Sequence, residues 1–151
     1  MIIDRTIEDV ISAKKIIEEK VKNFLELSTE DLAVLERGTF SVSTINRIEE
    51  KQKELYDFFI SSLYLGGDIN TRNWEENQEI FKQADMERIV KNNEVLRDMF
   101  FVYSSTPKEA NTSYTYENLN NIERLLFDLD RMYEFMLDNL KECDTFYCGE
   151  E

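Results

Sequence analysis

The fold is decided by residues 115–141, which read TYENLNNIERLLFDLDRMYEFMLDNLK. Apolar side chains recur in this stretch at alternating steps of three and four residues, the spacing that places them on one face of a helix. Thr115 stands where an N-cap is needed, and no glycine or proline follows it before Lys141. Such a helix is unstable alone in water, so other helices of the chain must cover its stripe. The stripe consists of Leu119, Ile122, Leu126, Leu129, Tyr133, Met136 and Leu140, widened by Leu125 and Met132.

Three further stretches have the same helical periodicity and supply the covering helices. The spacing of their apolar residues predicts core helices at about 6–27, 43–65, 85–103 and 115–142, with a tail at 143–151. Thr6 is a candidate N-cap, and Ser28 opens a short helix that ends at Gly38. No strand-type alternation of useful length is present. We therefore expect an all-α fold, a single domain of residues 1–151 built as an up-down four-helix bundle with a short accessory helix.

The charge balance limits the classes of partner. The chain has 32 acidic and 18 basic residues and a formal net charge of −14. Binding to phosphate backbones needs clustered Lys and Arg, so we expect no nucleic-acid ligand, and an anionic membrane surface would repel the chain. No secretory signal or membrane-spanning apolar run is present, which predicts a soluble protein made in the cytoplasm. The acidity serves either solubility or docking onto a basic partner.

The residues that usually perform catalysis or hold metals are scarce. The chain has no histidine, which removes the commonest general base and the commonest transition-metal ligand. Cys143 and Cys148 alone cannot complete a structural zinc site, and they are either ordinary small side chains or a conditional disulfide. Glu123, Asp128 and Asp130 lie off the apolar stripe, where we expect a solvated face and no metal site. We predict no enzyme activity, no cofactor and no bound metal.

Several residues remain as candidates for contacts inside or outside the bundle. Asn93 falls on the apolar stripe of the third core helix and needs buried hydrogen-bond partners if it points inward. Five aromatic residues lie outside the central stripes. They either close the ends of the bundle or form a patch that anchors a partner, as aromatic side chains often do at interfaces. These aromatic residues are Trp74, Tyr114, Tyr116, Phe146 and Tyr147.

Short motifs spread over nearly the whole chain resemble a known family. The chain resembles small helical proteins and domains encoded in the tail, baseplate and tail-fibre gene modules of phages and prophages of Gram-positive bacteria. The family often carries a proline between the positions of Trp74 and Met86, and this chain does not. The motifs are Asp4-Arg5-Thr6 with Asp9-Val10, Ile45-Asn46-Arg47-Ile48-Glu49, Trp74, Met86-Glu87-Arg88 with Asn92 and Leu96-Arg97, Tyr114-Thr115-Tyr116, Asn120-Asn121-Ile122-Glu123, Asp128, Asp130 and Phe146-Tyr147-Cys148-Gly149-Glu150.

The resemblance implies a structural or accessory protein of the virion tail without enzymatic activity. Its expected partners are other tail, baseplate or fibre proteins, or further copies of itself, after synthesis in the host cytoplasm. The ending around Glu150 either packs on the bundle or reaches a neighbour. Arg47, Arg88 and Arg97 are expected to fix helix register by pairing with acidic residues; the candidate acids are Glu49, Glu123, Asp128 and Asp130. The alternative function is a phage-encoded acidic inhibitor that occupies a basic groove on a host or defence protein.

Overall fold

The computed structural model describes residues 1–63, 66–75, 80–108 and 110–143, and all regular structure in these ranges is helical. The predicted all-α class is therefore confirmed. No helix in the described ranges is both long and apolar enough to cross a membrane. The elements are α1 (Ile7–Glu19), the 3-10 turn η1 (Val21–Asn23), α2 (Thr29–Gly38), α3 (Val42–Leu63), α4 (Gln83–Met99) and α5 (Tyr116–Cys143).

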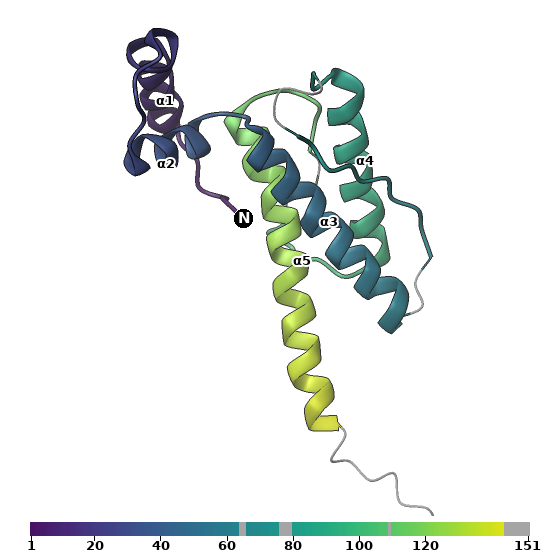
Figure 1. Cartoon of the computed structure of the whole chain (residues 1–151). Coiled ribbons are helices and arrows are strands. Elements are labelled where there is room, and N and C mark those ends of the chain that lie inside the picture. Colours follow the sequence, from purple (N-terminus) through teal and green to yellow (C-terminus); the bar gives the residue numbers. More distant parts are fainter. Residues whose placement is uncertain (64–65, 76–79, 109, 144–151) are drawn as a thin grey trace, which may run out of the picture.

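Helices α3, α4 and α5 pack against one another in a bundle-like arrangement that holds the apolar core (Figure 1). The first half of the α5 stripe is covered as predicted, since Ile122, Leu126 and Leu129 are fully buried. Figure 1 shows that α5 continues beyond the ends of α3 and α4. There Tyr133 is half-buried against Phe58, with ring centroids 3.8 Å apart. Coverage of the stripe by the same chain is thus complete only where the three helices run together.

Contrary to the expectation from the sequence, helix α1 does not join the bundle. It packs against α2 instead. The predicted helix at 6–27 ends early, at Glu19, and the chain reverses through η1 and Phe24. The two helices approach closely at Gly38. A Cβ added there would lie 2.4 Å from the Cβ of buried Ala13, so only glycine allows this packing. Gly38 ends α2 as predicted, and because it has no side chain it also allows α2 to pack closely against α1.

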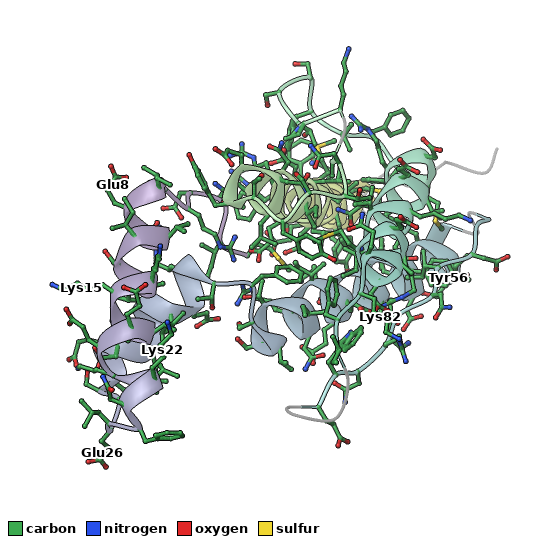
Figure 2. The ribbon with its side chains drawn as sticks, turned by 90° about the horizontal axis from the view of Figure 1, so that it is seen from above. Glu8, Lys15, Lys22, Glu26, Tyr56 and Lys82 are labelled. Atoms are coloured by element: carbon green, nitrogen blue, oxygen red, sulfur yellow. The ribbon has the colours of Figure 1, made fainter. Side chains whose placement is uncertain are left out.

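The resulting α1–α2 hairpin lies beside the end of the bundle where α3 and α5 begin (Figure 1). Seen from above, Glu8 lies at one end of the hairpin and Glu26 at the other (Figure 2). The predicted caps hold both helices in place. The Oγ1 of Thr6 accepts from the N–H of Asp9, and the Oγ of Ser28 accepts from the N–H of Asp31, each in a complete capping box.

Helix α4 starts two residues earlier and ends four residues earlier than the predicted range of 85–103. Lys82 is its N-cap residue, and the carboxylate of Asp85 accepts from the backbone N–H of Lys82. The helix stops at Met99 because Phe100 adopts an extended backbone, with its ring stacked on Phe59 at 4.9 Å. Tyr103, predicted on this helix, lies in the following loop. The bend thus places an additional aromatic ring over the core.

A buried carboxylate on α3 fixes the connection between α3 and α4. Glu49, 1% exposed, accepts two hydrogen bonds from Arg88 at 2.6 and 2.7 Å, so the predicted pairing of Arg88 is confirmed. The indole of Trp74 also donates to Glu49, at 2.9 Å, and the backbone N–H of Arg72 completes the set. Trp74 is only 5% exposed. Of the two alternatives for Trp74, the structure supports packing within the bundle over a contact with a partner, because its ring lies in the core and its N–H is used internally.

Amide side chains form a second buried network between α3, α4 and α5. Asn93 accepts from Gln52 at 2.7 Å and donates to the carbonyl of Ile122 at 3.2 Å. Gln52 also donates to the carbonyl of Ile89, at 2.8 Å. Asn93 therefore points inward and has the buried partners that this placement requires, and this network links the three helices in one register.

Candidate functional site

A groove of about 330 Å³ lies where the α1–α2 hairpin meets the start of α5. Its lining is mostly apolar. Met86 and Leu119, both nearly fully buried, belong to the core side of the lining. Ile7 and Tyr114 are exposed on its open side. The remaining lining residues are Arg5, Val10, Arg37, Gly38, Thr39, Phe40, Ser113, Thr115, Tyr116 and Glu117.

The loop before α5 is fixed by the side chain of Asn118. Its amide nitrogen donates to the carbonyls of Asn111 at 2.6 Å and Ser113 at 2.9 Å, while its oxygen accepts from the N–H of Asn111 at 2.8 Å. Thr115 caps the helix by accepting from the N–H of Asn118 at 3.2 Å, as predicted. These bonds place Tyr114 and Tyr116 at the groove.

Aromatic side chains build the wall next to this loop. The rings of Phe40, Phe81 and Tyr114 meet edge to face, with centroids 4.9 to 6.0 Å apart. Tyr114 is still 54% exposed. The cluster therefore gives the groove a firm apolar side that is open to solvent.

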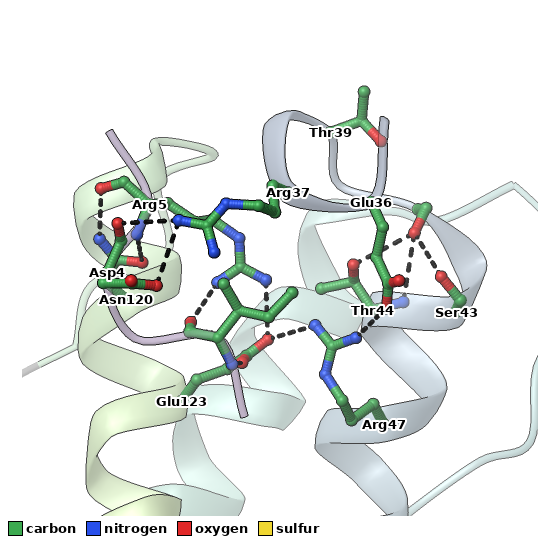
Figure 3. A network of polar contacts seen from close by, with 12 residues as sticks. Asp4, Arg5, Glu36, Arg37, Thr39, Ser43, Thr44, Arg47, Asn120 and Glu123 are labelled. Atoms are coloured by element: carbon green, nitrogen blue, oxygen red, sulfur yellow. Dashed lines mark hydrogen bonds and ion pairs between the residues drawn. The ribbon is translucent and has the colours of Figure 1, made fainter. Parts of the chain in front are cut away.

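A buried ion cluster holds the hairpin against the bundle (Figure 3). Glu123, with no exposed surface, accepts from Arg5 at 2.9 Å, from Arg47 at 2.8 Å and from the backbone N–H of Ile2. Burial lowers the pKa of Arg5, and its pairing with Glu123 opposes that shift. Arg47 also bonds Glu36 on α2 at 2.5 Å. The predicted Arg47–Glu123 pair is confirmed, whereas the expectation that Glu123 is solvated is wrong because residues 1–5 cover it.

A second set of ion pairs, centred on Arg37, closes the hairpin end of the groove. Arg37 donates to the carboxylate of Asp9 at 3.2 Å and to Asp4 at 3.2 Å. The hydrogen bond from Arg37 lowers the pKa of Asp9, and the same contact raises the pKa of Arg37. The backbone of Arg5 exchanges two hydrogen bonds with the side chain of Asn120, at 3.1 and 2.9 Å. The groove therefore has fixed walls on both the hairpin and the bundle.

The surface around the groove is negatively charged. Glu8 and Glu117 are exposed near Tyr116, and the hydrogen bond with Glu117 raises the pKa of the Tyr116 phenol, with a smaller effect from the charge of Glu8. Asp4 is also exposed, with 73% of its side chain accessible, but its charge is offset by Arg37, so the negative charge of the rim comes mainly from Glu8 and Glu117. An apolar side chain flanked by cationic groups is thus the chemistry that fits this site.

The structure separates the sequence-predicted residues into three groups. Tyr114 and Tyr116 come together at the groove. Trp74, Arg47, Arg88, Asn93 and Glu123 serve internal contacts, and Phe146, Tyr147, Cys148 and Glu150 lie outside the described residues, as does the side chain of Cys143. Within the described ranges, no cluster of three or more metal-ligating side chains occurs.

The other acidic candidates also make internal contacts. Asp128, 1% exposed, accepts from Thr106 at 2.5 Å and from Arg124 at 2.9 Å, so its expected solvation is also wrong. Asp130 is half-buried and pairs with Lys51 at 3.3 Å. None of the ion pairs between described residues includes Arg97. The acidic partner predicted for Arg97 is therefore not found among these residues.

Sequence reasoning missed the groove residues contributed by the hairpin. The sequence does not single out Arg37 and Phe40, because their place at the groove depends on the pairing of α1 with α2. The available signal was Gly38, a small residue that directly follows Arg37 and stands two positions before Phe40. Comparison with protein-family models, curated proteins and solved structures found no match to this chain.

Proposed function

We propose that this chain is a non-enzymatic structural or accessory component of a phage tail or baseplate-fibre apparatus, and that it acts by docking on another protein. The observation that carries the docking role is the apolar, solvent-open groove with an acidic rim between the hairpin and the bundle. The assignment to a tail module rests on the resemblance of the sequence motifs.

The groove also specifies the chemistry of its partner. An apolar or aromatic side chain would fill the space between Phe40, Tyr114 and Leu119. Lys or Arg residues beside that anchor would face Glu8 and Glu117. Buried aromatic anchors supply most of the binding energy at such interfaces, while the charges favour encounter and orientation.

The experiment is mass spectrometry and cryo-electron microscopy of purified particles that carry either the wild-type chain or a Ser113→Trp variant. Ser113 is an exposed groove residue whose hydroxyl bonds only Asn111 of the same loop, so we expect a tryptophan there to fill the groove from its open side. Ser105→Trp, in another exposed loop, is the matched control. We expect wild type and the control in particles and the groove variant to be depleted at least ~10-fold, the effect of about 1.4 kcal/mol of lost affinity. Equal incorporation of all three chains contradicts docking through the groove.

The acidic rim also favours the second candidate, an inhibitor of a host or defence protein with a basic groove. This candidate predicts that the chain is absent from particles. It further predicts capture of a host protein whose affinity falls steeply with salt, because charged contacts dominate the encounter. Salt-independent capture would contradict it.

A further inference from the structure

The α1–α2 hairpin does not share the apolar core of the bundle. Within the described ranges, the core and the partly buried residues packed on it include none of residues 7–38. Ala13 is the one fully buried residue of α1 and α2, and it lies against Gly38 of the hairpin itself. Figures 1 and 2 show the hairpin beside the bundle and not among its helices. The hairpin and the bundle are therefore two separate packing units.

The chain first passes from the bundle to the hairpin between Arg5 and Thr6. Arg5 belongs to the bundle, because its backbone exchanges two hydrogen bonds with the side chain of Asn120 and its guanidinium is bound to Glu123. The next residue, Thr6, is already the N-cap of α1. The change from one unit to the other thus takes place at a single peptide.

The chain returns to the bundle between Thr39 and Phe40, in an equally short step. The N–H of Thr39 donates to the carbonyl of Leu35 at 2.9 Å, so Thr39 belongs to α2. The side chain of Phe40 already packs against the core of the bundle. Both crossings leave the hairpin at the same end, because Gly38 lies against the backbone of Asp9. The far end of the hairpin is therefore not tied to the bundle by the chain.

Two ion pairs between described residues also span this joint. Glu36 pairs with Arg47 of α3 at 2.5 Å, and Arg37 pairs with Asp4 at 3.2 Å. The side chains of Glu36 and Asp4 are 45% and 73% exposed, and solvated ion pairs hold a fixed geometry only weakly. The buried Nε of Arg47 has no hydrogen-bond partner in the described part of the chain, which weakens this contact further.

The groove lies at this joint and takes one wall from each unit. Val10 and Gly38 belong to the hairpin wall, whereas Tyr114 and Leu119 belong to the bundle wall. Each wall is fixed within its own unit, the first by the capping box of α1 and the second by the contacts of Asn118. Rotation of the hairpin about the two crossings therefore changes the width of the groove without breaking a helix or exposing the core.

We propose that the α1–α2 hairpin is a hinged jaw of the groove, which rotates as a rigid body at the Arg5–Thr6 and Thr39–Phe40 junctions. A small and polar interface between two packing units permits such rotation, and a few backbone angles at a hinge are enough to absorb it. A partner anchored in the groove would select the hairpin angle at which both walls contact it. That consequence rests on the proposed docking role of the groove, whereas the rotation itself does not.

The test is double electron–electron resonance of the purified full chain, which measures the distribution of distances between two spin labels. Cys143→Ser and Cys148→Ser provide a background in which only introduced cysteines are labelled. Glu30→Cys on α2 and Lys91→Cys on α4 form the cross pair, which spans the joint. Because α1 is 13 residues long and spans about 20 Å, a rotation of about 15° moves the far end of the hairpin by about 5 Å. The cross-pair distribution should be broadened by a distance of this order.

Two reference pairs show whether each unit stays rigid. Lys14→Cys with Glu30→Cys lies within the hairpin, and Lys91→Cys with Glu134→Cys lies within the bundle. All of these positions are exposed, so the labels do not disturb the packing. Both reference distributions should stay narrow, because neither pair spans the joint.

Two matched comparisons connect the width of the cross-pair distribution to the joint and to the groove. Glu36→Gln removes an ion pair across the joint and should broaden the distribution, whereas Asp57→Asn removes an exposed ion pair within α3 and should not. Ser113→Trp fills the groove and should shift the maximum of the distribution, whereas Ser105→Trp, away from the groove, should not.

A cross-pair distribution as narrow as the reference distributions would overturn the inference. Equal widths for Glu36→Gln and Asp57→Asn would overturn it too, and so would broadening of a reference pair, which would mean loosening inside one unit. A narrow cross pair together with loss of Ser113→Trp from particles would overturn the hinge and leave the docking role intact. A broad cross pair together with equal incorporation of Ser113→Trp and wild type would support the hinge and contradict the docking role.

Discussion

Replacing Glu123 by glutamine should destabilise the protein far more than the loss of a partly solvated carboxylate such as Asp130. Glu123 is completely buried and accepts hydrogen bonds from two arginines. The side chain of Arg5 is 1% exposed, so its charge would remain buried without its carboxylate. Arg47 is 24% exposed and keeps its bond to Glu36. Most of the cost therefore comes from Arg5.

Removing one partner of a buried ion pair costs about 3–5 kcal/mol, a large share of the roughly 5–15 kcal/mol that stabilises a domain. Urea unfolding followed by circular dichroism measures the free energy of unfolding directly. Asp130→Asn is the matched control, because its pair with Lys51 is partly solvated and is expected to contribute below about 1 kcal/mol. Adding Arg5→Met to Glu123→Gln should recover part of the loss, since the uncompensated charge is then gone.

The reasoning is refuted if Glu123→Gln costs no more than Asp130→Asn. It is also refuted if the double variant is less stable than Glu123→Gln alone. Either result would mean that the cluster between the hairpin and the bundle contributes little to folding, and that the hairpin is held mainly by its apolar contacts.

Gly38→Ala should cost about 1–3 kcal/mol, because the new Cβ would lie 2.2 Å from a backbone oxygen of α1, whereas Gly66→Ala meets open space and serves as the control in thermal unfolding. Trp74→Phe should cost about 1–2 kcal/mol through the lost hydrogen bond to a buried carboxylate, and the wild-type tryptophan fluorescence should shift to the red on unfolding. The pKa of Asp31 is lowered in the folded state by its hydrogen bond from a lysine, so its contribution is present above the ordinary value of 3.8 and is lost as the pH falls through the folded pKa. Asp31→Asn should therefore flatten the acid side of the stability profile measured by urea unfolding; an unchanged slope below pH 5 would contradict this.

Local features of the fold could be predicted from the sequence because they depend on neighbouring residues. The caps at Thr6, Ser28 and Thr115 follow from side chains three residues from their partners. The inward placement of Asn93 follows from its position on an apolar stripe. Periodicity alone also sufficed for the all-helical class.

Partner choice over long distances could not be predicted in this way. The apolar face of α1 fits either α2 or the bundle, and the close approach at Gly38 selects α2. In the sequence this glycine predicts only the end of a helix. Glu123 has the spacing of an exposed acid, and it is buried because a segment more than 115 residues away crosses it. The groove was missed for the same reason, since it exists only where these distant segments meet.

The ion cluster around Glu123 also has a consequence for the order in which the chain matures during translation. The α1–α2 hairpin depends on contacts within the first 38 residues, so it can form as soon as this segment leaves the ribosome. Its anchor to the bundle requires a carboxylate that is synthesised about 120 residues after the arginine it binds. The hairpin is therefore expected to fold first and to dock on the bundle only after α5 has been synthesised. The groove forms at that last step.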